Sequence, residues 1–245
     1  MLKYAWAVLV AYAKLYNLKT NVRATDHLRR IDQGLPVQFR HVQSVLEHEA
    51  MTAKLVELIC WVYGDRLKAA GEKIDPMRSS FMASRHDDVE WRDGDMVPQL
   101  GYMNFTPEMK VIAERGALED LLGVEQNFLR DAHEEYEKRE TGDAILAKTG
   151  DILELFCHNR VLLCFGLGKI TYGNYKECAP ETHDESLEFL EKSPIGETSI
   201  AEVLEARYIK RFREMNFPTI YQDIFDEIVV ALRSFPFAEY ISVDR

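Results

Sequence analysis

The chain has 245 residues, of which 47% are hydrophobic and 29% are charged, enough apolar material for the core of one large soluble domain. Its formal net charge of −11 argues against a nucleic-acid polymer as the main ligand, because no sustained basic surface is available to a phosphate backbone. The apolar runs at residues 5–13 and 161–167 are too short to span a membrane. We therefore expect a soluble protein with no membrane partner.

The cysteines point to the same kind of environment. The four are Cys60, Cys157, Cys164 and Cys178, and no two of them have C-x-x-C spacing. Buried thiols in a reducing compartment are the expected state. This pattern favours a cytoplasmic location.

Helical periodicity dominates the chain, and no alternating stretch is long enough to predict a sheet. In chain order we predict helices at about residues 2–16, 26–32, 45–63, 108–115, 118–137, 143–167, 199–215 and 220–234. Gly64 is the expected end of the third helix. Residues 66–80 are predicted to form a loop or a short helix, and residues 172–194 are loop-like. The prediction is an all-α protein with a single domain over residues 1–245.

Residues 86–95 read H-D-D-V-E-W-R-D-G-D and offer several metal ligands within a short stretch. If this segment is helical, Glu90 shares a face with His86 and Asp87. Gly94 then lets the chain turn, so that Asp95 points back toward the same place. Neighbouring carboxylates repel one another unless a cation or a shared proton compensates for them. The alternative is a charged, solvated loop.

Two further candidate ligands fall on other predicted helices. His48 lies in the middle of the third helix, although a lone histidine there is more often an ordinary core or surface residue. Asp151 falls in the apolar stripe of the helix predicted at residues 143–167. A buried carboxylate needs a partner, which either Lys148 or a metal ion would supply.

Together these residues give the order H…HD…D, and residues 86–95 also match the pattern H-D-x-x-E-x-x-x-G-D at every fixed position. The chain thereby resembles the HD-domain metal-dependent phosphohydrolases. More narrowly, it resembles the branch of bacterial 5′-deoxynucleotidases and the HD-domain-containing protein 2-like proteins. The resemblance covers about residues 38–165, and residues 172–245 form a C-terminal helical extension. It implies an HD-domain helical bundle with extra N- and C-terminal helices.

The resemblance also implies a cofactor and roles for the matched residues. Its ligands to one divalent transition metal would be His48, His86, Asp87 and Asp151. Two imidazoles and two carboxylates suit Mn, Fe, Co, Ni or Zn. Glu90 would orient or deprotonate the attacking water. Asp95 would help to protonate the leaving alkoxide or hold the sugar, with a role in loop structure as the alternative.

Substrate binding is where the chain departs from the branch. Many members carry an Arg-Trp pair upstream of the first histidine, which holds the 5′-phosphate and crowds the sugar 2′ position, but residues 33–36 contain neither residue. The candidates that remain for substrate binding are Arg29, Arg30, Arg40, Lys148 and Trp91. For Lys148 the alternative is a salt bridge with Asp151, and for Trp91 it is a packing role.

The expected function is removal of the 5′-phosphate from (deoxy)nucleoside monophosphates by a metal-activated water. The partner is thus a small-molecule nucleotide. The alternatives are a (deoxy)nucleoside triphosphate triphosphohydrolase and a non-catalytic HD module that binds a nucleotide or a metal. Apolar helices beyond the matched core, such as residues 220–232, fit either a homodimer interface or the monomer's own core.

Overall fold

The computed structural model describes residues 2–16, 45–89, 107–122, 127–164 and 200–240. The helices are α1 (Leu2–Tyr16), α3 (Val45–Ala69), α4 (Pro76–Ala83), α6 (Pro107–Leu122), α7 (Asn127–Lys138), α8 (Gly142–Cys164), α11 (Ile200–Glu214), α12 (Thr219–Leu232) and α13 (Phe237–Tyr240). No strand occurs within these ranges, which confirms the all-α prediction. No helix among them is both long and apolar enough to cross a membrane.

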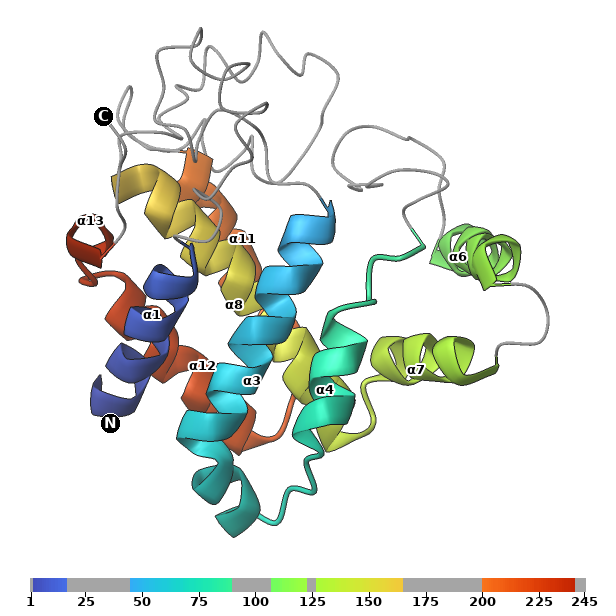
Figure 1. Cartoon of the computed structure of the whole chain (residues 1–245), viewed down its shortest axis with the longest axis horizontal. Helices are drawn as coiled ribbons and strands as arrows, with labels where there is room; N and C mark the ends of the chain where they lie inside the picture. The colour runs from blue at the N-terminus through green and yellow to red at the C-terminus, as the bar shows by residue number, and fades with distance from the viewer. Residues whose placement is uncertain (1, 17–44, 90–106, 123–126, 165–199, 241–245) are drawn as a thin grey trace, which may run out of the picture.

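Helix α8 lies at the centre of the bundle. It packs against α3 and α4 most closely and also contacts α7, α11, α12 and α13 (Figure 1). Every residue from 143 to 154 is buried, so this part of α8 is enclosed on all faces rather than along one apolar stripe. Polar side chains on this stretch are therefore held away from water, where they need partners.

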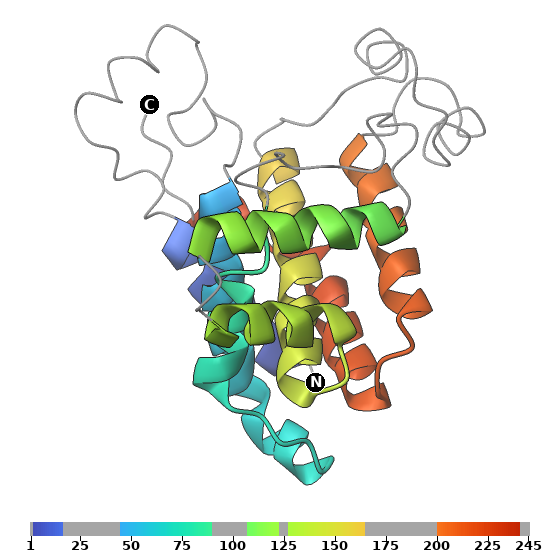
Figure 2. The same cartoon turned by 90° about the vertical axis from the view of Figure 1, so that its right-hand side faces the viewer.

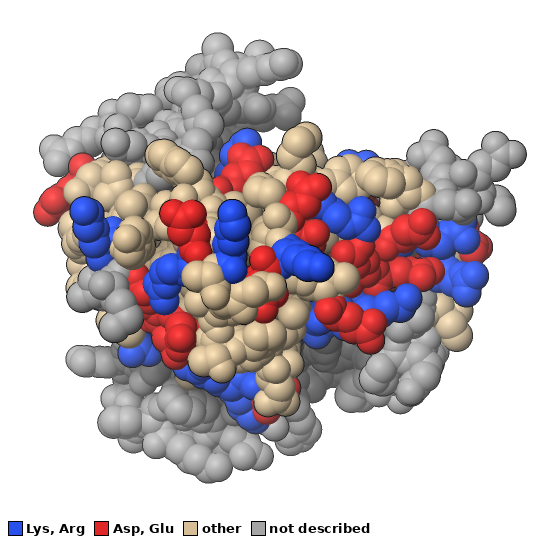
Figure 3. All heavy atoms as spheres, turned by 90° about the horizontal axis from the view of Figure 1, so that it is seen from below, with Lys and Arg blue, Asp and Glu red and all other residues tan. Residues whose placement is uncertain are grey.

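Helices α1 and α7 lie on opposite sides of this central helix. Helix α1 packs against α3, α12 and α13 and buries Ala5, Val8 and Leu9. Helix α7 packs on α4 and α8 at the opposite side (Figure 1), and it crosses α8 rather than running along it (Figure 2). Seen from below, the described surface carries acidic and basic side chains interspersed, without a continuous basic area (Figure 3).

The end of α3 differs from the prediction. The helix continues through Gly64 to Ala69, so Gly64 does not end it. The terminating glycine is Gly71, which has a φ of 86°, a conformation that other residues rarely adopt. The Gly71 N–H donates to the Lys68 carbonyl at 3.0 Å, and the Glu72 N–H donates to the Leu67 carbonyl at 3.1 Å. This pair of bonds satisfies the last carbonyls of α3.

A short helix, α4, follows within the stretch predicted to be a loop or a short helix. It begins at Pro76, after Asp75, whose carboxylate accepts the N–H groups of Met77 and Arg78 at 3.0 and 3.3 Å. It ends at Ala83, and residues 84–89 continue as turns. The pair His86-Asp87 therefore lies in the turn after α4, so the helical arrangement considered for residues 86–95 does not hold for these two candidate ligands.

Other helix boundaries also differ from those predicted. The predicted break between residues 115 and 118 is absent, because α6 continues to Leu122 while Ala117 and Leu118 pack with Val89 in a small separate core. The next helix, α7, begins only at Asn127. Cys157 is a buried free thiol, as predicted, whereas the free thiol Cys60 is only partly buried. The helix predicted at residues 26–32 and the loop predicted at residues 172–194 lie outside the described residues.

Candidate metal centre

Four of the predicted ligands converge where α3, α8 and the turn after α4 meet. His48, His86 and Asp87 each offer one ligand atom, and these atoms all lie within 4.8 Å of one another. The Oδ1 atom of Asp151 lies 3.1 Å from Nε2 of His48 and 3.5 Å from Nε2 of His86. Residues far apart in the sequence thus bring two imidazole nitrogens and two carboxylates to one place.

The His86 ring is oriented by the end of α4. Its Nδ1 atom lies 2.7 Å from the Ala83 carbonyl oxygen, so Nδ1 carries a proton and donates it. Its Nε2 atom then faces the carboxylates, 3.2 Å from Oδ2 of Asp87. The α4 C-terminus therefore selects the tautomer of His86 that leaves Nε2 free to bind a metal.

One carboxylate oxygen of Asp151 accepts hydrogen bonds from neighbouring side chains, and the other is directed at the candidate metal site. Its Oδ2 atom accepts a bond from Lys148 Nζ at 2.6 Å and one from the Tyr136 hydroxyl at 3.1 Å. Lys148 Nζ also donates to the Tyr136 hydroxyl at 3.1 Å, and all three side chains are buried. The remaining oxygen, Oδ1, is the one directed at the two histidines.

Asp87 is positioned through its backbone. Its N–H donates to Oε1 of Glu49 at 3.1 Å, which ties the turn after α4 to α3. Burial, and after it the nearby Asp88 carboxylate, raise the pKa of Glu49 to about 7. Glu49 directly follows His48 in α3. The same helix therefore contributes the candidate ligand His48 and the carboxylate that binds the backbone of Asp87.

A close approach of α3 and α8 brings His48 of α3 near Asp151 of α8. A Cβ atom added at Gly150 would clash with Cγ2 of Val56. Only a glycine therefore allows α8 to approach α3 this closely. Gly150 directly precedes Asp151, so this close contact lies next to the pairing of Asp151 with His48.

The electrostatics of the centre are those of buried acids stabilised by cations. Burial opposes ionisation of Asp151, but Lys148, His86 and His48 together hold the pKa of its carboxyl well below the usual value. Burial likewise opposes protonation of His86, but Asp151 and Asp87 outweigh it and raise the His86 pKa to about 10. Without a metal ion, protons on the histidines compensate for the carboxylates, and a bound cation would replace those protons.

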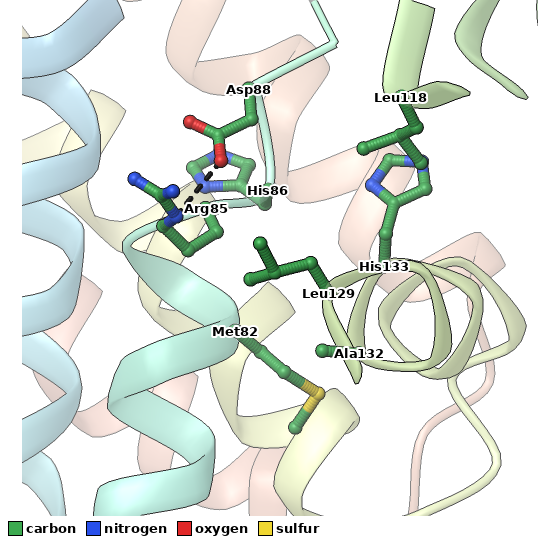
Figure 4. Close-up of a pocket in the computed structure, with 8 residues that line it drawn as sticks. All are labelled: Met82, Arg85, His86, Asp88, Leu118, Leu129, Ala132 and His133. Atoms are coloured by element: carbon green, nitrogen blue, oxygen red, sulfur yellow. Dashed lines mark ion pairs between the residues drawn. The ribbon is translucent and has the colours of Figure 1, made fainter. Parts of the chain in front are cut away.

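One side of His86 borders a small, mainly apolar pocket between α4, α6 and α7 (Figure 4). Its apolar lining residues are Met82, Leu118, Leu129 and Ala132. Arg85 and Asp88 also line it and form an ion pair with Nε and Oδ2 2.9 Å apart. His86 itself is buried, and the low dielectric of its surroundings strengthens the electrostatic interactions of its ring.

The other predicted site residues divide into two groups. Lys148 is buried and paired with Asp151, so the salt bridge named as the alternative for this residue is present, whereas a contact with phosphate stays a prediction. The candidates that lie outside the described residues are Arg29, Arg30, Arg40, Glu90, Trp91 and Asp95.

Three residues of the centre were not predicted: Glu49, Tyr136 and Glu154. The signal for Glu154 was present, since it is a second acid in the buried helix α8, three positions after Asp151 and thus on the same face. Tyr136 lies among the charged residues of α7 and gave no comparable signal.

These residues fit a divalent transition metal. Two imidazole nitrogens and carboxylate oxygens form a mixed nitrogen and oxygen set that suits such ions better than Ca²⁺. His86 and Asp151 have a second polar atom bonded elsewhere in the protein, an arrangement typical of metal ligands. The identity of the ion does not follow from the ligand types.

Comparison with known protein families gives a match to the HD domain over residues 25–175, more than half of the chain. Comparison with curated proteins and with solved structures gives no match. The matched residues include all four converging ligands, while α1, α11, α12 and α13 lie outside them. HD domains are in general metal-dependent phosphohydrolases. The chain belongs to the HD-domain family.

Proposed function

We propose that this protein removes the 5′-phosphate from nucleoside monophosphates by metal-dependent hydrolysis. The observation that supports a hydrolytic centre most strongly is the convergence of two imidazole Nε2 atoms and two carboxylates around one place. The H-D-x-x-E-x-x-x-G-D pattern of residues 86–95 supports the nucleotidase type, because it is the pattern of that branch.

In this proposal His48, His86, Asp87 and Asp151 would hold one divalent ion, which would supply positive charge to lower the pKa of water and polarise the phosphoryl group. Glu90 takes a proton from the water that attacks phosphorus. The bond from phosphorus to the 5′ oxygen breaks, and Asp95 delivers a proton to that oxygen or holds the sugar. Glu90 directly follows Val89, the last residue of the described turn, and is only three positions from Asp87.

Substrate binding is assigned by chemistry. Arg30 or Arg40 would hold the phosphate through paired N–H groups, and Trp91 would stack on the base. Lys148 Nζ lies 2.6 Å from the Asp151 carboxylate. A contact between Lys148 and the phosphate would therefore be made in addition to this ion pair. The absence of the Arg-Trp pair from residues 33–36 leads us to expect weak discrimination between ribose and deoxyribose.

The test is a panel of ribo- and deoxyribonucleoside 5′-mono- and triphosphates, each assayed with Mn, Co, Ni and Zn. We expect free phosphate from monophosphates, lost in Glu90→Gln and retained in Glu119→Gln, whose carboxylate is exposed on α6. Release of triphosphate would instead identify a triphosphohydrolase. Metal and nucleotide binding without turnover of any substrate would overturn the proposal in favour of a non-catalytic module.

A further inference from the structure

We infer that Glu154 is a positioning residue for His48: its carboxylate fixes the imidazole tautomer that presents Nε2 to the metal. The inference rests on the proposed metal centre and is independent of which phosphate ester is the substrate. It adds Glu154 to the centre as a group that acts through a ligand and does not itself bind the metal.

The geometry places His48 between two carboxylates of the same helix. Nδ1 of His48 lies 2.7 Å from Oε2 of Glu154, and Nε2 lies 3.1 Å from Oδ1 of Asp151. Asp151 and Glu154 are three positions apart on α8, so they share a face and bracket the ring. The ring therefore has little freedom to rotate without losing one of these contacts.

The choice of tautomer follows from which carboxylate stays available as an acceptor once a metal is bound, because Asp151 Oδ1 would then ligate the metal and Glu154 would not. A neutral imidazole has one N–H donor and one nitrogen lone pair, and an ionised carboxylate can only accept a hydrogen bond. If Nδ1 donates to Glu154, the lone pair is on Nε2, where Asp151 Oδ1 and the Asp87 and His86 ligand atoms also converge. If Nε2 carried the proton, His48 could not bind a metal through that atom.

Burial makes the Glu154 interaction specific. The Glu154 side chain is 0% exposed, in the part of α8 that is enclosed on all faces. A buried carboxylate requires a hydrogen-bond or ionic partner, and His48 supplies one from α3. The same contact fixes the histidine, as a carboxylate behind a metal-ligating imidazole does in other metal sites.

His86 provides an internal comparison. Its Nδ1 atom is held at the same distance of 2.7 Å, but by the neutral Ala83 carbonyl. In the metal-bound form the two histidines would thus share the same tautomer, selected in one case by a carboxylate and in the other by a backbone oxygen. The charge on Glu154 should make His48 the more basic of the two ligands toward a metal.

The experiment measures Mn²⁺ and Zn²⁺ affinity by calorimetry on the full chain for wild type, Glu154→Gln and Glu154→Leu. We expect affinity to fall about 10- to 100-fold in Glu154→Leu and by a smaller factor in Glu154→Gln, whose amide oxygen can still accept from Nδ1. The control is Glu227→Gln, a buried acid of α12 that accepts bonds from Tyr63 and Arg66 and should leave metal affinity unchanged.

A second measurement separates positioning from a loss of folding. Nitrogen-15 NMR of the histidine rings reports the tautomer, and the Zn²⁺-bound wild type should show His48 protonated at Nδ1 and metal-bound at Nε2. Glu154→Leu should show a mixture while the His86 signals persist. Unchanged affinity and an unchanged His48 tautomer in Glu154→Leu would overturn the inference. Absence of metal binding in the wild type would instead overturn the proposed centre itself.

Discussion

The Nε2 atom of His48 lies 3.1 Å from Oδ1 of Asp151, although 103 positions separate the two residues in the chain. Helix α3 supplies the histidine and the central helix α8 supplies the aspartate. This contact joins the two longest helices described, at the point where the turn after α4 brings in His86 and Asp87. Four predictions test how this arrangement is held and what it does.

The first prediction concerns the cation beside Asp151. Lys148→Met removes the buried ammonium group and leaves the Asp151 carboxylate with less compensation, so the free energy of unfolding should fall by about 3 kcal/mol. The measurement is urea denaturation of the metal-free protein. Added Zn²⁺ should recover part of the loss, because a second cation then compensates for Asp151.

The control for this change is Lys54→Met. Lys54 forms an ion pair with Glu57 at 2.8 Å, but both side chains are about half exposed. Exposed pairs contribute little, so a loss of about 0.5 kcal/mol or less is expected. Equal losses in the two variants would contradict the role assigned to Lys148.

The second prediction concerns the approach of α3 to α8. Gly150→Ala places a methyl group against Val56 Cγ2, so α3 and α8 must separate or Val56 must move, at a cost of about 1–3 kcal/mol. Because the displaced helix carries His48, metal affinity should fall as well. Thermal denaturation and calorimetry measure the two effects.

Two further variants make this prediction specific. Val56→Ala combined with Gly150→Ala removes the clashing methyl group and should restore much of the metal affinity. Gly64→Ala adds a methyl group where nothing lies within 4 Å, within α3, and should raise stability by roughly 0.5–1 kcal/mol. If Gly150→Ala behaves like Gly64→Ala, the close helix contact is not needed.

The third prediction is a pH dependence of metal binding. Burial opposes protonation of His48, but Asp151 and Glu154 outweigh it and raise its pKa well above the usual value, while that of His86 rises to about 10. Both rings are thus protonated near pH 7 in the metal-free protein, and binding must displace about two protons. Calorimetry in buffers of different ionisation enthalpy should detect this release, with affinity rising toward pH 10. Heats independent of the buffer would contradict it.

The metal-free protein should show the opposite trend in stability. A histidine whose folded-state pKa is raised contributes stability that is fully present below its unfolded-state pKa of about 6.5. That contribution is lost as the pH rises through about 10, the folded-state pKa of His86. The metal-free protein should therefore become less stable over this window, while saturating metal should reduce the loss.

Much of the fold could be predicted because helical periodicity is a local signal. The first helix is reproduced over residues 2–16, and the last two long helices within one or two residues. Helix ends were less predictable, because Gly64 and Gly71 are both glycines near a plausible end. Only the backbone conformation of Gly71, with its φ of 86°, decides between them.

The candidate ligands that converge could be named from the sequence, but the groups that hold their side chains in place could not. The order H…HD…D depends on residue types, which the sequence shows directly. The contacts from Glu154 to His48 and from Tyr136 to Asp151 depend on how helices pack, which the sequence does not show. A helix at residues 86 and 87 was one of two possibilities that their spacing allowed, but α4 ends at Ala83 and a turn carries them.

The fourth prediction is the most direct test of the central claim. Phosphate release from nucleoside 5′-monophosphates and bound metal should be measured on the same preparations of wild type, Asp87→Ala and Asp65→Ala, whose aspartate is exposed on α3. We expect wild type and Asp65→Ala to bind about one metal ion per chain and to release phosphate only with metal present. Asp87→Ala should lose both properties. If Asp87→Ala releases phosphate as fast as wild type, the metal centre described here is not the site of hydrolysis.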